Sequence, residues 1–141
     1  MNKILVPTDF SPTSQSALKY VADLFKQFGR NLELTLVHAY WVPDTHDTDI
    51  VSMNDRLKKR SIQQLEEEKA FFLQELADEN VKINTCARLG TLNNVILRAL
   101  EQDSFDLIVM AKDKGKKIKN LISSVKRAKK PCPITTVFPT I

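Results

Sequence analysis

Short, wholly apolar runs alternate along this chain with longer segments whose apolar residues recur at helical spacing. The runs at residues 4–6 and 107–110 are typical of strands that are buried on both faces of a sheet. Strict alternation of such strands with helices favours a parallel sheet covered by helices on both sides. Because 141 residues suit one domain, we predict a single doubly wound α/β domain over residues 1–141.

The pattern predicts five strands and four helices. Strands are expected at residues 4–6, 32–39, 81–87, 107–110 and 134–138, with 81–87 at a sheet edge and 107–110 inside the sheet. Helices are expected between Ser11-Pro12 and Gly29, from Asn54 to about Asp78, after Thr91, and at the apolar stripe of residues 118–125. Residues 41–53 are expected to form an irregular linker, and the acidic run 66–68 a solvated helix face.

The positive charge of the chain is concentrated in one segment. Residues Lys112 to Lys130 carry eight lysines and one arginine against one aspartate, a net charge of +8, whereas the rest of the chain sums to −4. A local positive field of this kind attracts anions. We therefore predict that Lys112–Lys130 contacts an anionic ligand or an acidic protein partner.

The cysteines and the N-terminal residues indicate neither a metal nor a membrane. Cys86 and Cys132 lie far apart, without the neighbouring ligands of a zinc site or a redox motif, so two buried, reduced thiols are expected. The apolar run before Pro7 is too short for a signal peptide or a spanning helix. The chain is therefore expected to be cytoplasmic, without a metal and without a membrane partner.

No catalytic constellation is visible in the sequence. His38 lies inside an apolar strand and His46 in the linker, with no Ser or Cys arrangement beside either that suggests a triad. We expect His38 to be a hydrogen-bonded residue of the core or its rim. Tyr40 and Trp41 allow two interpretations, a stacking platform for a base or a lid over the edge of the core. The sequence predicts no catalytic residue and a protein that is not an enzyme.

Four motifs follow one another in an order that resembles the universal stress protein family. They are the Ile4-Leu5-Val6-Pro7-Thr8-Asp9-Phe10-Ser11 segment, the Arg88-Leu89-Gly90-Thr91 turn, the Asp106-Leu107-Ile108-Val109-Met110 strand and the Pro131-Cys132-Pro133-Ile134 segment. The resemblance covers essentially the whole chain. It implies a Rossmann-like, five-stranded sheet of order 3-2-1-4-5, a homodimer formed along the last strand, Ile134 to Phe138, and a non-catalytic role in stress physiology.

The resemblance also implies where a nucleotide would bind. ATP-binding members resemble one another in a loop after the fourth strand, whose glycines let backbone N–H groups approach the phosphates closely. In this chain Ala111 and Lys114 replace the first two glycines, and Ser123-Ser124 replaces the final Gly-Ser pair. Gly115 is a partial substitute, and only the Ser124 hydroxyl matches the pattern. We therefore predict weak or absent ATP binding and no resident cofactor.

The candidate nucleotide site comprises six residues, from the ends of the first, second and fourth strands and from the loop after the fourth strand. Its members are Asp9, Val37, Ala111, Gly115, Ser123 and Ser124. In ATP-binding relatives the acid that matches Asp9 contacts the nucleoside, and backbone at the position of Val37 holds the adenine edge. The alternative is that Asp9 only accepts hydrogen bonds from backbone donors of the turn at residues 8–11.

Two alternative functions stand beside the non-enzymatic stress protein. The first is an ATP-binding regulatory domain, extended to a slow ATPase, in which the loop closes around Gly115 with altered geometry. The second is sequence-blind nucleic-acid binding by Lys112–Lys130, a segment that has charge but no aromatic residue for base stacking. The missing aromatic residues make nucleic acid the weaker alternative.

Overall fold

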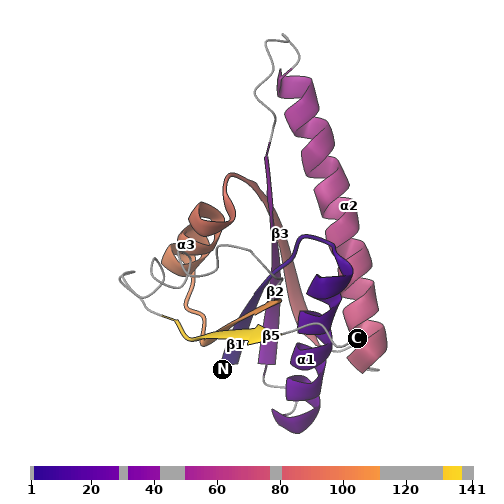
Figure 1. Ribbon diagram of the computed structural model, residues 1–141, viewed down its shortest axis with the longest axis vertical. Coiled ribbons are helices and arrows are strands. Elements are labelled where there is room, and N and C mark those ends of the chain that lie inside the picture. The colour runs from indigo at the N-terminus through magenta and orange to yellow at the C-terminus, as the bar shows by residue number, and fades with distance from the viewer. Residues whose placement is uncertain (1, 29–31, 42–49, 77–80, 112–131, 138–141) are drawn as a thin grey trace.

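Five parallel strands form the sheet that organises the molecule (Figure 1). The computed structural model describes residues 2–28, 32–41, 50–76, 81–111 and 132–137. The strand order is β3-β2-β1-β4-β5, and each adjacent pair runs parallel. The predicted α/β class and the order 3-2-1-4-5 are therefore confirmed, with β3 at one edge and β4 inside the sheet.

The elements alternate as the sequence pattern predicted. The strands are β1 (Asn2–Pro7), β2 (Leu32–Tyr40), β3 (Lys82–Leu89), β4 (Leu107–Ala111) and β5 (Ile134–Val137). The helices are α1 (Pro12–Phe28), α2 (Ile50–Leu76) and α3 (Leu92–Gln102). The Ser11 hydroxyl accepts a 3.3 Å hydrogen bond from the Ser14 N–H and Pro12 is the first helical residue, so the predicted start of α1 is confirmed.

The main differences from prediction lie at the ends of elements. Helix α2 begins at Ile50, so the expectation of an irregular linker as far as residue 53 is wrong there. Residues 50–53 contain neither Gly nor Pro, and nothing in them interrupts the helical hydrogen bonds upstream of Asn54. Strands β2 and β3 continue to Tyr40 and Leu89, because the two residues pair with each other in register. The helix expected at residues 118–125 lies outside the described residues.

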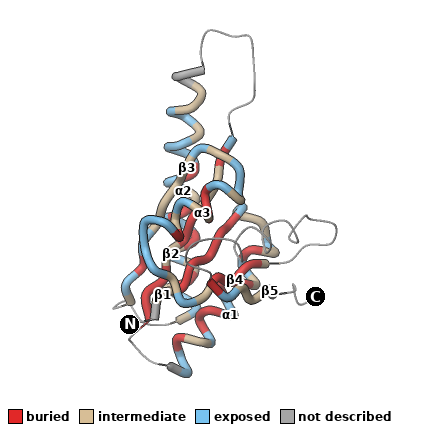
Figure 2. The backbone as a smooth tube through the Cα atoms, turned by 90° about the vertical axis from the view of Figure 1, so that its left-hand side faces the viewer, coloured by how far each residue is buried: buried red, intermediate tan, exposed pale blue. Residues whose placement is uncertain are grey.

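The helices form two layers, one on each face of the sheet. Helices α1 and α2 cover one face, and α3 covers the other (Figure 1). The larger apolar cluster joins α1 and α2 to the sheet, and the smaller one joins α3 to it. Figure 2 shows the buried residues gathered along the strands at the centre of the molecule. Because helices cover both faces of the sheet, a ligand has access to it at the carboxyl ends of the strands.

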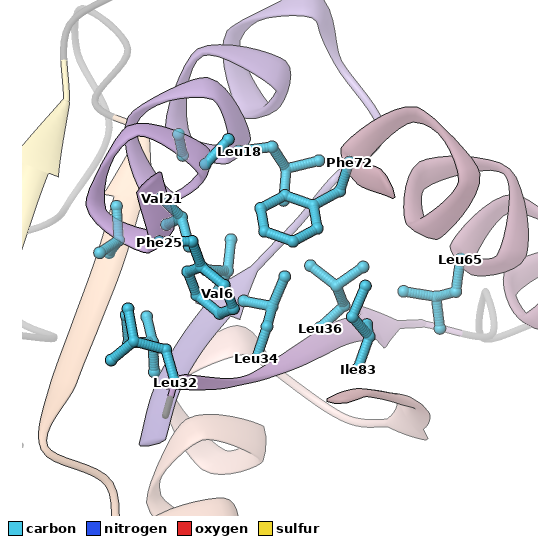
Figure 3. Packing of buried hydrophobic residues seen from close by; sticks show 14 residues of the cluster. Val6, Leu18, Val21, Phe25, Leu32, Leu34, Leu36, Leu65, Phe72 and Ile83 are labelled. Atoms are coloured by element: carbon cyan, nitrogen blue, oxygen red, sulfur yellow. The ribbon is translucent and has the colours of Figure 1, made fainter. Parts of the chain in front are cut away.

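Helix α2 packs on the sheet through one stripe of side chains. Leu65 and Phe72 are 1% and 0% exposed, and both point into the cluster on the sheet, where Leu65 lies beside Leu36 and Ile83 (Figure 3). Helical spacing places residue 68 on the same stripe, one turn from each of them. Residue 68 of this stripe lies next to Thr8, which directly follows β1, and the candidate site begins there.

Candidate functional site

The turn between β1 and α1 lies at the carboxyl ends of the strands. The β1 strand ends at Pro7, which pairs with Val37 of β2, and the N–H of Thr8 donates to the carbonyl of Val37 at 2.9 Å. Val37 itself is 2% exposed. We name Thr8, Asp9, Val37, His38 and Ala111, all at or near strand ends, the strand-end site. In open α/β sheets, ligands bind outside this edge.

Asp9 is exposed, and its own turn holds its carboxylate in one orientation. Its Oδ1 accepts hydrogen bonds from the Ser11 N–H at 3.0 Å and from the Ser14 hydroxyl at 2.6 Å. The Ser14 oxygen in turn accepts the Asp9 N–H at 3.2 Å. Asp9 therefore accepts a backbone donor of the turn, as the alternative interpretation predicted. The same bonds fix an exposed carboxylate at the end of β1.

Thr8 makes hydrogen bonds through both its backbone and its side chain. It is 5% exposed, and its hydroxyl oxygen accepts the Phe10 N–H at 3.1 Å. Phe10 has a φ of 64°, in the left-handed region that non-glycine residues adopt rarely. A residue in that region costs of order 1–3 kcal/mol and persists only where its surroundings hold it. The Thr8 hydroxyl is one of the groups that hold it.

His38 closes the site from β2. Its Nδ1 lies 2.7 Å from the Thr8 carbonyl oxygen, and because a carbonyl only accepts, Nδ1 carries the proton. The His38 ring also lies against Phe10, with ring centroids 4.2 Å apart. The prediction of a hydrogen-bonded histidine at the rim of the core is confirmed, because His38 is half-buried and bonded.

The neighbouring aromatic residues differ from each other in exposure. Tyr40 is 8% exposed, which fits the interpretation of a lid over the edge of the core. Trp41 is 64% exposed, so the lid interpretation is wrong for this residue. Tyr40 is the last residue of β2, and its side chain turns inward, whereas Trp41 lies just beyond the strand.

Glu68 is a residue of the site that the sequence analysis missed. The acidic run 66–68 was expected to be solvated, yet Glu68 is 7% exposed, so the expectation is wrong for this residue. Its Oε1 accepts the Thr8 hydroxyl at 3.0 Å. Burial raises the pKa of Glu68 above its usual 4.5, and the nearby Asp9 charge also raises it, while the Thr8 hydrogen bond opposes the shift. Spacing from Leu65 and Phe72 was the signal that could have found it.

Of the candidate residues near the expected phosphate position, the structure describes Ala111. Ala111, where the family pattern has a glycine, is the half-buried last residue of β4 and pairs with Val137 of β5. The other candidates Gly115, Ser123 and Ser124 lie outside the described residues, as does all of Lys112–Lys130. The structure therefore brings together Asp9 and Val37 through Thr8, and it places Ala111 at the same edge of the sheet.

Within the described ranges, no group of three or more His, Cys, Asp or Glu side chains is arranged to hold a metal ion. The thiols of Cys86 and Cys132 are both free, and Cys132 is buried whereas Cys86 is only half-buried. Burial, with a contribution from Asp106, raises the pKa of Cys132 to about 11. No helix among the described residues is long and apolar enough to cross a bilayer.

Comparison with known proteins identifies relatives over nearly the whole chain. The sequence profile of the Universal stress protein family matches residues 1–128. A search of curated proteins found no significant match. Among solved structures, a universal stress family protein from Burkholderia pseudomallei superposes with a TM-score of 0.73 at 20% identity, covering 96% of this chain and 95% of the other.

Two further structures contain nucleotides. A family protein from Arabidopsis thaliana with AMP bound superposes with a TM-score of 0.71 at 17% identity, covering 99% of this chain and 93% of the other. A universal stress protein in complex with cAMP superposes with a TM-score of 0.64 at 16% identity, covering 99% and 98%. At such identities, these superpositions show a shared fold.

Proposed function

The chain belongs to the universal stress protein family, and we propose that it is a non-enzymatic stress-response protein that binds an adenine mononucleotide at its strand-end site. The Asp9 carboxylate carries this proposal, because it is exposed and the turn holds it at the carboxyl end of β1. A fixed carboxylate suits the hydroxyl groups of a ribose, since a carboxylate accepts and hydroxyls donate.

Ala111 supports a mononucleotide over ATP. The family pattern has a glycine at this position, and any Cβ restricts how closely the backbone can approach a phosphate group. A triphosphate depends on many such backbone contacts, whereas one phosphate group depends on few. ATP binding is therefore weak or absent in this proposal.

Relatives with bound nucleotides support a ligand of this class. AMP occupies the Arabidopsis thaliana relative and cAMP another family member. Each ligand contains one phosphate group. The fixed Asp9 carboxylate and a loop sequence without the family's phosphate-binding glycines suit this class of ligand.

We further propose that the protein is a cytoplasmic homodimer paired along Ile134 to Phe138. The position of β5 at the edge of the sheet supports this, because an edge strand presents backbone groups that can pair with a second copy. A contact of Lys112–Lys130 with an anionic ligand or an acidic protein stays a prediction from sequence, as does nucleic-acid binding.

Calorimetry with AMP, cAMP and ATP, the last with and without Mg²⁺, tests the proposed function. We expect one mononucleotide per chain and an affinity at least about tenfold higher for AMP or cAMP than for ATP, a difference of about 1.4 kcal/mol. Asp9→Ala should abolish the mononucleotide signal. Asp55→Ala is the matched control, because Asp55 is an exposed acid on α2 that pairs only on the surface with Lys59.

Each other outcome selects a different function. Tighter binding of ATP than of AMP would support the ATP-binding regulatory domain, and phosphate release on incubation would add a slow ATPase to it. Absence of binding by all three nucleotides would contradict the proposed ligand. Copurified nucleotide, seen as excess absorbance near the nucleotide band, would identify the ligand directly.

A further inference from the structure

We infer that Glu68 is a positioning residue for the strand-end site, acting through the Thr8 hydroxyl on the turn that presents Asp9. The inference rests on the proposed function for its consequence in ligand binding. Its structural part, the control of the turn by Glu68, can be measured without any ligand.

The place of Glu68 in α2 is unusual for an acid. It lies on the buried stripe between Leu65 and Phe72, which point toward the sheet (Figure 3). An apolar side chain at this position would leave no buried acceptor unpaired, whereas Glu68 has one in Oε2. Packing alone therefore does not explain a carboxylate here. Its specific contact is the 3.0 Å hydrogen bond from the Thr8 hydroxyl.

That bond determines how the Thr8 hydroxyl is used. A hydroxyl has one proton, and the Thr8 hydroxyl donates it in the hydrogen bond to Glu68 Oε1. With the proton held in that direction, a lone pair of the Thr8 oxygen points to the Phe10 N–H, 3.1 Å away. Glu68 thus orients the Thr8 hydroxyl, so that its proton points to α2 and a lone pair faces the Phe10 N–H, at the point where Phe10 adopts its left-handed conformation.

The turn passes this constraint on to Asp9. Asp9 lies between Thr8 and Phe10, so fixing both neighbours fixes the direction in which its side chain leaves the backbone. The Ser14 hydroxyl then receives the Asp9 N–H and donates to its carboxylate. Glu68 and Asp9 are joined in this way although they come from α2 and the β1–α1 turn.

The second carboxyl oxygen of Glu68 has a different environment. Oε2 is buried and lacks a hydrogen-bond partner among the residues that the structure describes. Among the described residues, Asp9 is the charged side chain that acts on Glu68. His38 of β2 bonds the Thr8 carbonyl, and the Thr85 hydroxyl of β3 donates to the neighbouring Glu66. The unpaired Oε2 lowers the stability of the folded protein, since an unpaired buried acceptor costs about 1–3 kcal/mol. This cost favours a role in the site over a purely structural one.

Substitutions at both ends of the hydrogen bond separate positioning from stability. Glu68→Leu removes the acceptor but suits the apolar stripe, and Thr8→Val removes the hydroxyl. Glu68→Gln and Thr8→Ser keep the acceptor and the hydroxyl, respectively. Ser61→Ala is the control on α2, because Ser61 is 4% exposed and bonds only the Leu57 carbonyl in the described contacts.

We expect Glu68→Leu and Thr8→Val to weaken AMP binding about threefold to tenfold, the range that one hydrogen bond supplies. Glu68→Gln and Thr8→Ser should bind AMP within about twofold of the unmodified protein, which is rescue by the conservative variant. Glu68→Leu removes the unpaired Oε2 but leaves the Thr8 hydroxyl without its acceptor, whereas Thr8→Val removes that donor, so the thermal midpoints of the two variants are compared as well. A lower midpoint with unchanged AMP affinity in both Glu68→Leu and Thr8→Val would overturn the inference and leave a structural brace.

A second measurement needs no nucleotide. In ¹H–¹⁵N NMR spectra of the free protein, the Phe10 amide should show a pH inflection above pH 4.5 that disappears in Glu68→Gln and persists in Ser61→Ala. If no nucleotide binds the unmodified protein, the proposed function fails while this titration still decides the inference. An identical Phe10 titration in the unmodified protein and in Glu68→Gln would overturn it.

Discussion

The ring of Phe72 in α2 meets the ring of Phe25 in α1 edge to face, with centroids 5.4 Å apart and an angle of 84° between the planes. Both residues belong to the cluster between these helices and the sheet, at 0% and 3% exposure. The pair therefore joins two helices that also frame the strand-end site. Removing either ring should destabilise the larger apolar cluster.

Phe72→Ala should lower the free energy of unfolding by about 3–5 kcal/mol, because it removes a fully buried ring and leaves a cavity. Urea unfolding followed by circular dichroism measures the change. Phe71→Ala is the matched control, since Phe71 is only half-buried beside the same cluster and should cost clearly less. Equal losses for the two variants would contradict the assigned packing.

Glu68→Gln should become more stable relative to the unmodified protein as pH rises. The pKa of Glu68 is raised in the folded state, so its protonated form stabilises the fold below pH 4.5, and this contribution is lost as pH rises through the folded pKa. Urea unfolding at intervals from pH 4.5 to 8 measures the difference between the two proteins. Glu67→Gln controls for net charge at an exposed position. A difference independent of pH would contradict this linkage.

The two thiols should react with an alkylating reagent at very different rates. Cys132 is 7% exposed with a pKa of about 11, so about one thiol in a thousand is ionised at pH 8. Cys86 is half-buried on β3 and should react first. Mass spectrometry of timed samples should show one fast label, which Cys86→Ser removes and Cys132→Ser retains. Rapid labelling of Cys132 in the folded protein would show that its site opens.

Gly90→Ala should destabilise the fold by about 1–3 kcal/mol through backbone strain. Gly90 has a φ of +141°, which an alanine rarely adopts, and a Cβ there meets Val95 Cγ2 at an ordinary 3.6 Å. The cost is therefore conformational and not steric. Thermal unfolding measures it, and Leu89→Ala, at an exposed neighbouring position, should change the midpoint little. A neutral Gly90→Ala would show that the turn relaxes.

Thr136→Pro should convert the proposed dimer to a monomer while the fold persists. The Pro133 carbonyl accepts the Ile108 N–H, so odd-numbered residues of β5 face β4 and the peptide groups of Ile134 and Thr136 face outward. Proline removes one outward N–H, whereas Thr136→Val keeps it. Sedimentation velocity should show a dimer for Thr136→Val and a smaller species for Thr136→Pro. A monomeric unmodified protein at high concentration would contradict the dimer itself.

The sequence by itself determined the class of fold and the order of the strands. Apolar runs such as residues 107–110 identify buried strands because parallel strands are covered on both faces. Ser11 and Pro12 determined the start of α1 through local hydrogen bonding and a fixed backbone angle. The family motifs then supplied the order 3-2-1-4-5, and they marked Asp9, Val37 and Ala111 as candidates for one site.

Only the tertiary structure decided which polar side chains meet at that site. Glu68 follows Thr8 by 60 residues in the sequence, and an acidic run on a helix ordinarily faces water. Its burial depends on how α2 lies across the end of β1, a relation between distant segments that no local pattern contains. The same holds for His38, whose proton lies on Nδ1 only because the Thr8 carbonyl is 2.7 Å away. Local propensities determine elements, whereas packing of elements determines which groups share a buried, low-dielectric environment.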